Sequence, residues 1–270
     1  MSGAIAKYHR RVEAVDSLLC VGLDSQFDRL PPRFQADPHP QFAFNRWIID
    51  QTYPYVSAYK PNMAFYEARG AAGLTDLALT MAYLRDNHPD ILTICDAKRA
   101  DIGSTNEGYV AAIFDRLGFD AVTLNPYLGR EALMPFLERA DRGCIILCRT
   151  SNPGAGELQD RLVDGRPLWQ VVAEQVRDSW NVHGNCMLVA GATYPDELAR
   201  IRTLVGAMPL LVPGIGAQGG EVAATVRAGL APDGRGLIIN ASRAVIFDSD
   251  PAAAARALRD AIREAASACR

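Results

Sequence analysis

The chain has 270 residues, of which 49% are hydrophobic and 22% charged, and its formal net charge is −3. These are the proportions of an ordinary soluble globular protein, and the absence of a block of like charges argues against nucleic acid or an anionic membrane as the main partner. No apolar run is long enough to cross a bilayer, and residues 1–11 lack the apolar core of a signal peptide. We therefore expect a cytoplasmic protein.

Short apolar runs alternate with stretches of helical periodicity along the whole chain. The predicted strands are residues 18–24, 56–62, 91–98, 121–127, 144–150, 187–192, 210–215 and 236–241. Helical spacing follows in residues 74–85, 168–182, 194–205 and 221–228, and Asp250 with Pro251 is expected to start a final helix over 251–269. Residues 27–40, rich in proline, are interpreted as a surface excursion. Eight alternating strands predict an α/β protein, a (β/α)8 TIM barrel, and the lack of a linker predicts one domain over residues 1–270.

Polar residues stand at the ends of six of these strands. In a barrel of this kind the chemistry sits on the loops at the carboxyl ends of the strands. Those positions are Asp24, Lys60, Asp96 with Lys98, Asn125, Ser151 and Arg243. We expect them to surround one pocket.

The third predicted strand runs into Asp96-Ala97-Lys98-Arg99-Ala100-Asp101. Because side chains alternate along a strand, Asp96 and Lys98 are expected on the same side, whereas Asp101 lies beyond the strand on a turn closed by Gly103. Charged side chains at the end of a core strand cost folding free energy unless they serve a function or are well paired. The pattern is consistent with proton transfer in a pocket and also with a structural cluster of ion pairs.

Lys60 ends the second predicted strand, and alternation places it on the same face as Ala58 and Asn62. It should therefore enter the same barrel mouth as Lys98. Unit charges about 4 Å apart interact by roughly 4 kcal/mol at an effective dielectric near 20, so an alternating row of lysines and aspartates can keep its members ionised. The alternative is a solvated lysine at a strand end.

Residues 212–220 contain a GxGxxG pattern between a strand and a helix. One interpretation is a dinucleotide fingerprint, but the next strand ends in Ser242-Arg243 rather than in an acidic residue. The other is a phosphate site after the seventh and eighth strands, where Gln218 donates from its amide and Arg243 binds two oxygens. A tight glycine turn beside a surface arginine remains the simplest alternative.

Two further polar positions have a functional and a structural interpretation. Ser151 begins a long loop that reaches about Pro167. Its side chain can hydrogen-bond to an amide or carbonyl of a ligand, or the residue can belong to a plain turn. Asp24 can bind a sugar hydroxyl or cap the turn that follows it.

Cys20, Cys95, Cys144 and Cys148 lie in or beside strand-like runs and are expected to be buried and free. The cysteines and histidines show no metal-ligand spacing, so no structural metal is expected.

Taken together, these segments resemble the orotidine 5′-phosphate decarboxylase family. The resemblance rests on Asp96-x-Lys98-x-x-Asp101-Ile102-Gly103-x-Thr105 and extends from Leu23-Asp24 to Arg243. The Ser151-Asn152-Pro153-Gly154 segment and the Ser104-Thr105-Asn106-Glu107 continuation are similar to the longer bacterial branch. Ala100 departs from that branch, where glycine is expected, but it replaces none of the charged positions.

The resemblance implies a homodimer that converts orotidine 5′-monophosphate to uridine 5′-monophosphate and CO2, the last step of de novo pyrimidine nucleotide synthesis, without metal or organic cofactor. Lys98 would stabilise and protonate the C6 carbanion. Asp96 would face the substrate carboxylate and hold Lys98. The family pattern further implies that Lys60 acts in the same subunit, whereas Asp101, Ile102 and Thr105 reach into the partner's site. Asp24 and Thr105 would bind the ribose and Ser151 the pyrimidine. Pro213 would lie against the substrate, and Gln218 and Arg243 would bind the phosphate.

Other classes of protein share parts of this pattern. A sugar-phosphate aldolase or synthase of related barrel type has Asp-x-Lys-x-x-Asp but uses a divalent metal, and Lys60 with residues 102–105 favours the decarboxylase instead. A catalytically silent nucleotide-binding barrel would keep Gln218 and Arg243 without turnover. A nicotinamide oxidoreductase built on residues 214–219 is the weakest alternative.

Overall fold

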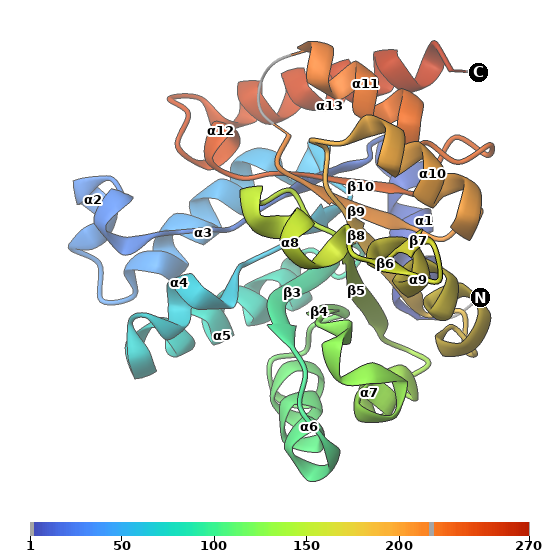
Figure 1. Ribbon diagram of the computed structural model, residues 1–270. Coiled ribbons are helices and arrows are strands. Elements are labelled where there is room, and N and C mark those ends of the chain that lie inside the picture. Colours follow the sequence, from blue (N-terminus) through green and yellow to red (C-terminus); the bar gives the residue numbers. More distant parts are fainter. Residues whose placement is uncertain (1–2, 216–218, 270) are drawn as a thin grey trace.

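The computed structural model describes residues 3–215 and 219–269. Eight parallel strands close into a barrel in the order β1-β10-β9-β8-β5-β4-β3-β2, surrounded by helices (Figure 1). The strands are β1 (Leu19–Val21), β2 (Ala58–Tyr59), β3 (Leu92–Arg99), β4 (Ala121–Leu124), β5 (Gly143–Arg149), β8 (Cys186–Ala190), β9 (Leu210–Pro213) and β10 (Leu237–Ala241). Each lies within or within one residue of a predicted run, and the predicted (β/α)8 barrel is confirmed.

Helices connect consecutive strands and surround the barrel (Figure 1), while α1 precedes β1, and α12 and α13 follow β10. They are α1 (Ala4–Val15), α2 (Pro32–Gln35), α3 (Pro40–Thr52), α4 (Met63–Glu67), α5 (Gly70–Asn87), α6 (Gly103–Val110), α7 (Gly129–Leu137), α8 (Gly156–Gln159), α9 (Leu168–Gln175), α10 (Pro195–Val205), α11 (Gly219–Gly229), α12 (Arg243–Ile246) and α13 (Pro251–Ser267). As predicted, Asp250 starts the last helix, because its side chain accepts a hydrogen bond from the Ala253 amide at 2.9 Å.

Two excursions interrupt the regular alternation. The predicted surface segment 27–40 contains a 3-10 turn at Phe27–Arg29 and the short α2. The long loop after β5 contains α8 and an antiparallel hairpin, β6 (Leu162–Val163) with β7 (Arg166–Pro167), which lies outside the barrel. Within the described residues, no helix is long and apolar enough to span a membrane.

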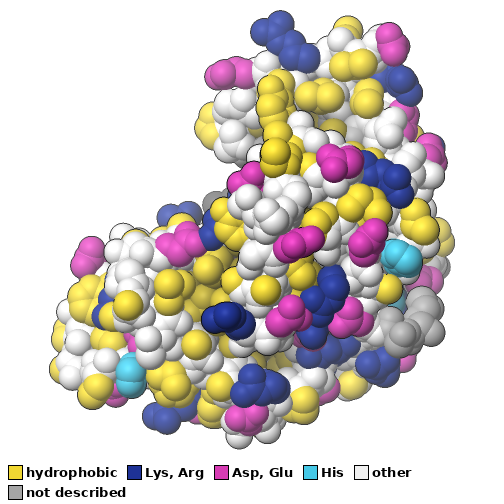
Figure 2. All heavy atoms as spheres, turned by 90° about the horizontal axis from the view of Figure 1, so that it is seen from below, with side chains coloured by type: hydrophobic (Ala, Val, Ile, Leu, Met, Phe, Trp, Pro, Cys, Tyr) yellow, Lys and Arg dark blue, Asp and Glu magenta, His cyan; other side chains and the backbone are white. Residues whose placement is uncertain are grey.

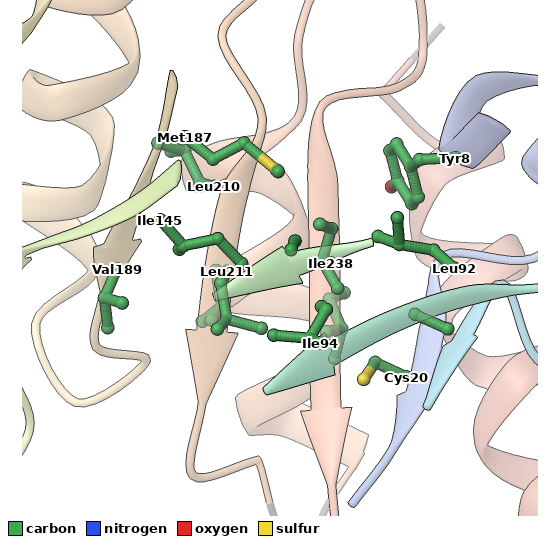
Figure 3. Packing of buried hydrophobic residues seen from close by; sticks show 14 of the residues in the cluster. Tyr8, Cys20, Leu92, Ile94, Ile145, Met187, Val189, Leu210, Leu211 and Ile238 are labelled. Atoms are coloured by element: carbon green, nitrogen blue, oxygen red, sulfur yellow. The ribbon is translucent and has the colours of Figure 1, made fainter. Parts of the chain in front are cut away.

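Apolar side chains from the strands fill the barrel interior (Figure 3). Leu92, Ile94, Ile145 and Leu211 are among the side chains labelled in this cluster, and each is at most 2% exposed. Burying a side chain of this size contributes about 1.5–3 kcal/mol to the stability of the fold.

Helix α1 packs beside the start of β10, where the buried Tyr8 hydroxyl donates to the Leu237 carbonyl. The four cysteines predicted to be buried, Cys20, Cys95, Cys144 and Cys148, are buried and free.

Strand β3 is the irregular member of the barrel. Its Cys95 pairs with Val122 of β4, but the next pair joins Arg99 to Leu124, so β3 carries two more residues than β4 between the pairs. Extra residues of this kind bend a strand and redirect side chains, and they are common next to active sites. The irregularity falls on Asp96, Ala97 and Lys98, at the carboxyl end of the barrel.

Candidate active site

The carboxylate of Asp96 is the centre of a hydrogen-bonded cluster. Its Oδ2 accepts from Lys60 Nζ at 2.9 Å and from Asn62 Nδ2 at 3.4 Å. Its Oδ1 accepts from Lys98 Nζ at 2.6 Å and from Thr123 Oγ1 at 2.9 Å. Two ammonium groups thus share one carboxylate, each on a different oxygen, and the carboxylate cannot rotate without losing contacts on both sides.

The neighbouring strands hold this cluster in place. Asn62 forms a parallel bridge with Asp96, and the Asp96 amide donates to the Pro61 carbonyl at 3.0 Å. Thr123 of β4 accepts from the Lys98 amide at 2.9 Å while its hydroxyl donates to Asp96. The Thr123 hydroxyl therefore fixes both the backbone of Lys98 and its partner Asp96, a role that was not predicted from the sequence. Its signal was a polar residue in the middle of a fully buried strand.

The two lysines differ in exposure. The Lys60 side chain is 4% exposed and that of Lys98 is 48% exposed, with the 10% exposed Asp96 between them. Burial by itself would raise the pKa of Asp96, but Lys60 and Lys98 outweigh it and hold that pKa well below its ordinary value. Burial would likewise lower the pKa of Lys60, but Asp24 and Asp96 raise it above its ordinary value. Asp96 and Lys60 are consequently both charged at neutral pH.

A second polar group lies where β1 and β10 end. Ser242 Oγ donates to Asp24 Oδ2 at 2.5 Å, whereas Asp24 Oδ1 is buried with no hydrogen-bond partner among the described residues. A Cβ on Gly22 would lie 2.1 Å from Ser242 Oγ, so the approach of this serine requires glycine at position 22. An unpaired buried carboxylate oxygen is costly, and a ligand hydroxyl pointing at it would remove that cost.

Two adjoining cavities open at this end of the barrel. The first, of about 380 Å³, lies between the lysines and an apolar wall of Leu147, Val189 and Leu211. The second, of about 450 Å³, extends toward Asp24, Ser242 and Arg243. Both are lined by Lys60, Asp96, Ser151 and Pro213, so they form one continuous site. One end of that site is apolar beside two cations, and the other carries a carboxylate and an exposed arginine.

Ser151 lines both cavities from the loop after β5. Its backbone lies against Gly191, where an added Cβ would come within 2.9 to 3.1 Å of the Ser151 N, Cα and Cβ atoms. Ser151 therefore occupies its position only because residue 191 has no side chain. This contact was not predicted from the sequence either, since the two residues are far apart in the chain.

The buried Arg149 anchors the same loop. Its Nε donates to Glu197 Oε2 at 2.6 Å, its Nη2 lies 3.4 Å from Asp160 Oδ1, and its guanidinium stacks over the Tyr194 ring at 4.2 Å. Gln159 of α8 also accepts from the Thr150 amide at 2.9 Å. One planar cation thus ties β5, α8 and α10 together around the cavity.

Asp101, Ile102 and Thr105 lie apart from this site. They follow β3 on the segment that enters α6, which projects from the barrel (Figure 1), and none of the three lines either cavity. Ile102 is 62% exposed. The four predicted charged residues thus do not form one row within a single chain, because the chain turns away after Lys98. Asn125 instead caps a turn by accepting from the Tyr127 amide at 3.1 Å.

Of the two residues predicted to bind a phosphate, Arg243 lies in the described part of the structure. Arg243 lines the larger cavity at the start of α12, and Pro213 lines both cavities at the end of β9. Gln218 lies outside the described residues. Among residues 3–215 and 219–269, no group of three or more His, Cys, Asp or Glu side chains is placed to hold a metal ion.

A closed parallel barrel with a charged pocket at the carboxyl ends of its strands has the architecture of the (β/α)8 enzymes. The family model described as "Orotidine 5′-phosphate decarboxylase / HUMPS family" matches residues 17–258. The chain belongs to this family.

Known relatives match over nearly their whole length. A protein of Cellvibrio japonicus named orotidine 5′-phosphate decarboxylase is 53% identical over 254 residues, covering 92% of both chains. One of Roseiflexus castenholzii with the same name is 53% identical over 257 residues, covering 92% of this chain and 93% of its own. Among solved structures, that of Leishmania donovani OMP decarboxylase is 38% identical, has a TM-score of 0.88 and covers 99% of both chains.

Proposed function

We infer that this chain catalyses the decarboxylation of orotidine 5′-monophosphate to uridine 5′-monophosphate and CO2 in pyrimidine biosynthesis. Membership of the family and the names of its relatives support this reaction. The observation that carries it is the Asp96 carboxylate, held between Lys60 and Lys98 at the floor of a cavity that is large enough for a ligand.

The chemistry requires a cation at the carbon that loses CO2. When the bond between C6 and the carboxyl carbon breaks, its electron pair stays on C6, and the ring offers no electron sink. The Lys98 ammonium stabilises this charge and then transfers a proton to C6, after which solvent restores the proton to the half-exposed amine. Asp96 holds the ammonium and faces the substrate carboxylate, while Lys60 keeps Asp96 ionised.

The remaining candidate residues bind the nucleotide. Asp24 accepts from a ribose hydroxyl, a role that its unpaired buried Oδ1 supports. Ser151 contacts the pyrimidine and Pro213 lines the pocket beside it. Arg243 and Gln218 bind the phosphate, and the exposed Arg243 at the mouth of the larger cavity is consistent with that role. Binding energy from the distant phosphate contributes to stabilisation of the transition state.

The site is completed by a second copy of this chain. Asp101, Ile102 and Thr105 are proposed to enter the partner's pocket, with Thr105 on the ribose. Their distance from the cavities of their own chain and the exposure of Ile102, Tyr127 and Leu128 support this arrangement. Figure 2, which views the molecule from the side on which α6 lies, shows exposed hydrophobic side chains among charged ones. Such side chains suit an interface between subunits.

The chain is proposed to act as one domain over residues 1–270, in the cytoplasm, without metal or organic cofactor and without nucleic acid or membrane as a partner. Contacts of α1 and α13 with the barrel support the single domain. Ala4 donates to the Asp141 carbonyl at 3.1 Å, and α13 packs against β1, α3 and α11. A metal-dependent sugar-phosphate aldolase is not favoured, since the family match and the named relatives are decarboxylases.

The test is the fall in absorbance as orotidine 5′-monophosphate is consumed, followed with and without EDTA. We expect turnover that does not change with the chelator. No turnover by folded protein that binds uridine 5′-monophosphate would contradict the proposal and favour a silent nucleotide-binding barrel. Turnover abolished by EDTA and restored by a divalent cation would instead contradict the cofactor-free mechanism.

A further inference from the structure

The buried side chain of Asn106 binds the backbone of Asp101. Asn106 Oδ1 accepts from the Asp101 amide at 3.0 Å, and Asn106 Nδ2 donates to the Asp101 carbonyl at 2.5 Å. The side-chain amide thus pairs with both polar groups of one residue, as a neighbouring strand would do. Asn106 is itself fully buried.

The same side chain fixes this segment to the next helix. Asn106 Nδ2 also donates to the carbonyl of Ala132 in α7 at 2.5 Å. Two donors and one acceptor of the amide are therefore used, which is expected of a buried asparagine. Because Ala132 is itself buried, α7 serves as a rigid support for the position of Asp101.

The segment that carries Asp101 needs such a support. It begins at Lys98 and ends at Gly103, which both have left-handed backbone conformations, with φ of 49° and 51°. Between them the chain leaves the barrel, and Ile102 is exposed. Asn106 fixes the Asp101 backbone at its amide and its carbonyl, and Asp101 Oδ1 in turn accepts from the Ile102 amide at 2.8 Å.

We propose that Asn106 is a positioning residue that holds Asp101 in the orientation required by the active site of the partner subunit. This inference rests on the shared site of the proposed function and deepens it. Asn106 acts through Asp101 and does not itself contact the substrate. A residue with this role affects the partner's site and leaves its own subunit's Lys60, Asp96 and Lys98 competent.

The experiment uses Asn106→Ala in the full-length protein. Removing the amide frees the Asp101 backbone, and we expect kcat/KM to fall by about 10- to 100-fold, since misplacing a group by about 1 Å can cost on the order of 10²-fold. Hydrogen exchange of the Asp101 amide should accelerate. If Asn106→Ala does not fold, Asn106→Ser, which keeps a short polar side chain, is used in its place and assessed by the same criteria.

Mixing subunits separates this role from a merely structural one. Asn106→Ala is mixed with inactive Asp96→Ala, so that each mixed dimer contains one site with an intact lysine cluster and an intact partner Asp101. We expect recovery to about a quarter of wild-type activity, because random pairing makes about half of the dimers mixed and each holds one intact site. Asp101→Ala mixed with Asp96→Ala is the reference.

Asn185→Ala is the matched control. Asn185 is also buried, and its Nδ2 donates to the carbonyls of Leu137 and Arg139 at 3.0 and 3.2 Å, but it precedes β8 at the opposite end of the barrel. The control is expected to lose stability while activity per folded subunit stays within about twofold of wild type.

Three results would overturn the proposal. Wild-type activity in folded Asn106→Ala would show that Asp101 needs no such support. Loss of activity without recovery on mixing, while the reference pair does recover, would place the defect in Asn106's own subunit and leave the shared site standing. No recovery in the reference pair despite demonstrated subunit exchange would remove the shared site itself, and with it the role of Asn106.

Discussion

The Lys98 ammonium lies 2.6 Å from Asp96 Oδ1, although the backbone between these two residues is not a regular strand. Lys98 has φ of 49°, a conformation that costs a residue with a side chain about 1–3 kcal/mol. Strain of this size persists only where the surroundings compensate for it. Here the Thr123 hydroxyl binds the Lys98 amide, and the ion pair with Asp96 holds the other end of the residue.

Replacing Lys98 by alanine is expected to abolish nearly all turnover of orotidine 5′-monophosphate, because the proton donor is lost. A positioned general acid contributes on the order of 10²–10⁴-fold, so at least that loss is expected. Uridine 5′-monophosphate should still bind, as measured by calorimetry. Lys7→Ala is the control, since Lys7 pairs with Asp120 outside the cavities. Retention of more than about a tenth of the activity by Lys98→Ala would remove Lys98 from its role.

The stability of the wild-type protein should depend on the ionisation of Asp96 in acid. The folded protein lowers the pKa of this carboxyl, so the stabilisation is fully present above the ordinary value of 3.8 and is lost as the pH falls below it. Urea unfolding of wild type and Asp96→Asn should therefore differ most near neutral pH, and the difference should begin to shrink below about pH 4 and continue to shrink toward the lowered pKa of the folded state.

Asp86→Asn serves as the control for this pH dependence. Asp86 is 64% exposed and pairs with an equally exposed Arg85, and exposed pairs contribute little to stability. Its difference from wild type should stay small at every pH. A difference between wild type and Asp96→Asn that stays constant down to pH 3 would contradict the role of the ion pairs in stability.

Inactive Asp96→Ala and Asp101→Ala subunits should restore activity when they are mixed. If Asp101 enters the partner's site, both lesions of a mixed dimer fall in one site, which leaves the other site intact. Activity is measured after subunit exchange has been demonstrated with differently tagged chains. Recovery that is absent at complete exchange would mean that each chain supplies both residues to its own site.

Replacing Gly191 by alanine should displace Ser151. The added Cβ would lie 2.9 to 3.1 Å from the Ser151 N, Cα and Cβ atoms, so the loop must shift. Because Ser151 is proposed to bind the pyrimidine, kcat/KM should fall by roughly 10-fold or more. Gly154→Ala is the control on the same loop, since its Cβ meets Glu157 Oε1 only at 3.5 Å. Equal kinetics for both variants would exclude the Gly191 contact as a determinant of binding.

Periodicity alone located all eight barrel strands, and the polar residues at their ends pointed to one pocket. Lys60, Asp96 and Lys98 do meet there, as do Asp24, Ser151 and Arg243 at its walls. Thr123 and Ser242 were missed, and Asn62 was placed on the face of Lys60 without its contact to Asp96, because a single polar residue within or after a strand carries no sign of the neighbour it binds. The contact between Gly191 and Ser151 joins two loops that follow different strands, β8 and β5, so no local pattern can reveal it.

The sequence by itself determined the barrel and the family, because strand and helix periods and the spacing of Asp96, Lys98 and Asp101 are local properties of the chain. Only the tertiary structure decided which of these charges meet. Lys60 binds Asp96 because β2 and β3 are neighbours in a closed parallel sheet, whereas Asp101 is carried away from them by the left-handed turn at Lys98. The interaction energy of two charges depends on their distance in space, and that distance is fixed by packing and backbone conformation rather than by separation along the chain.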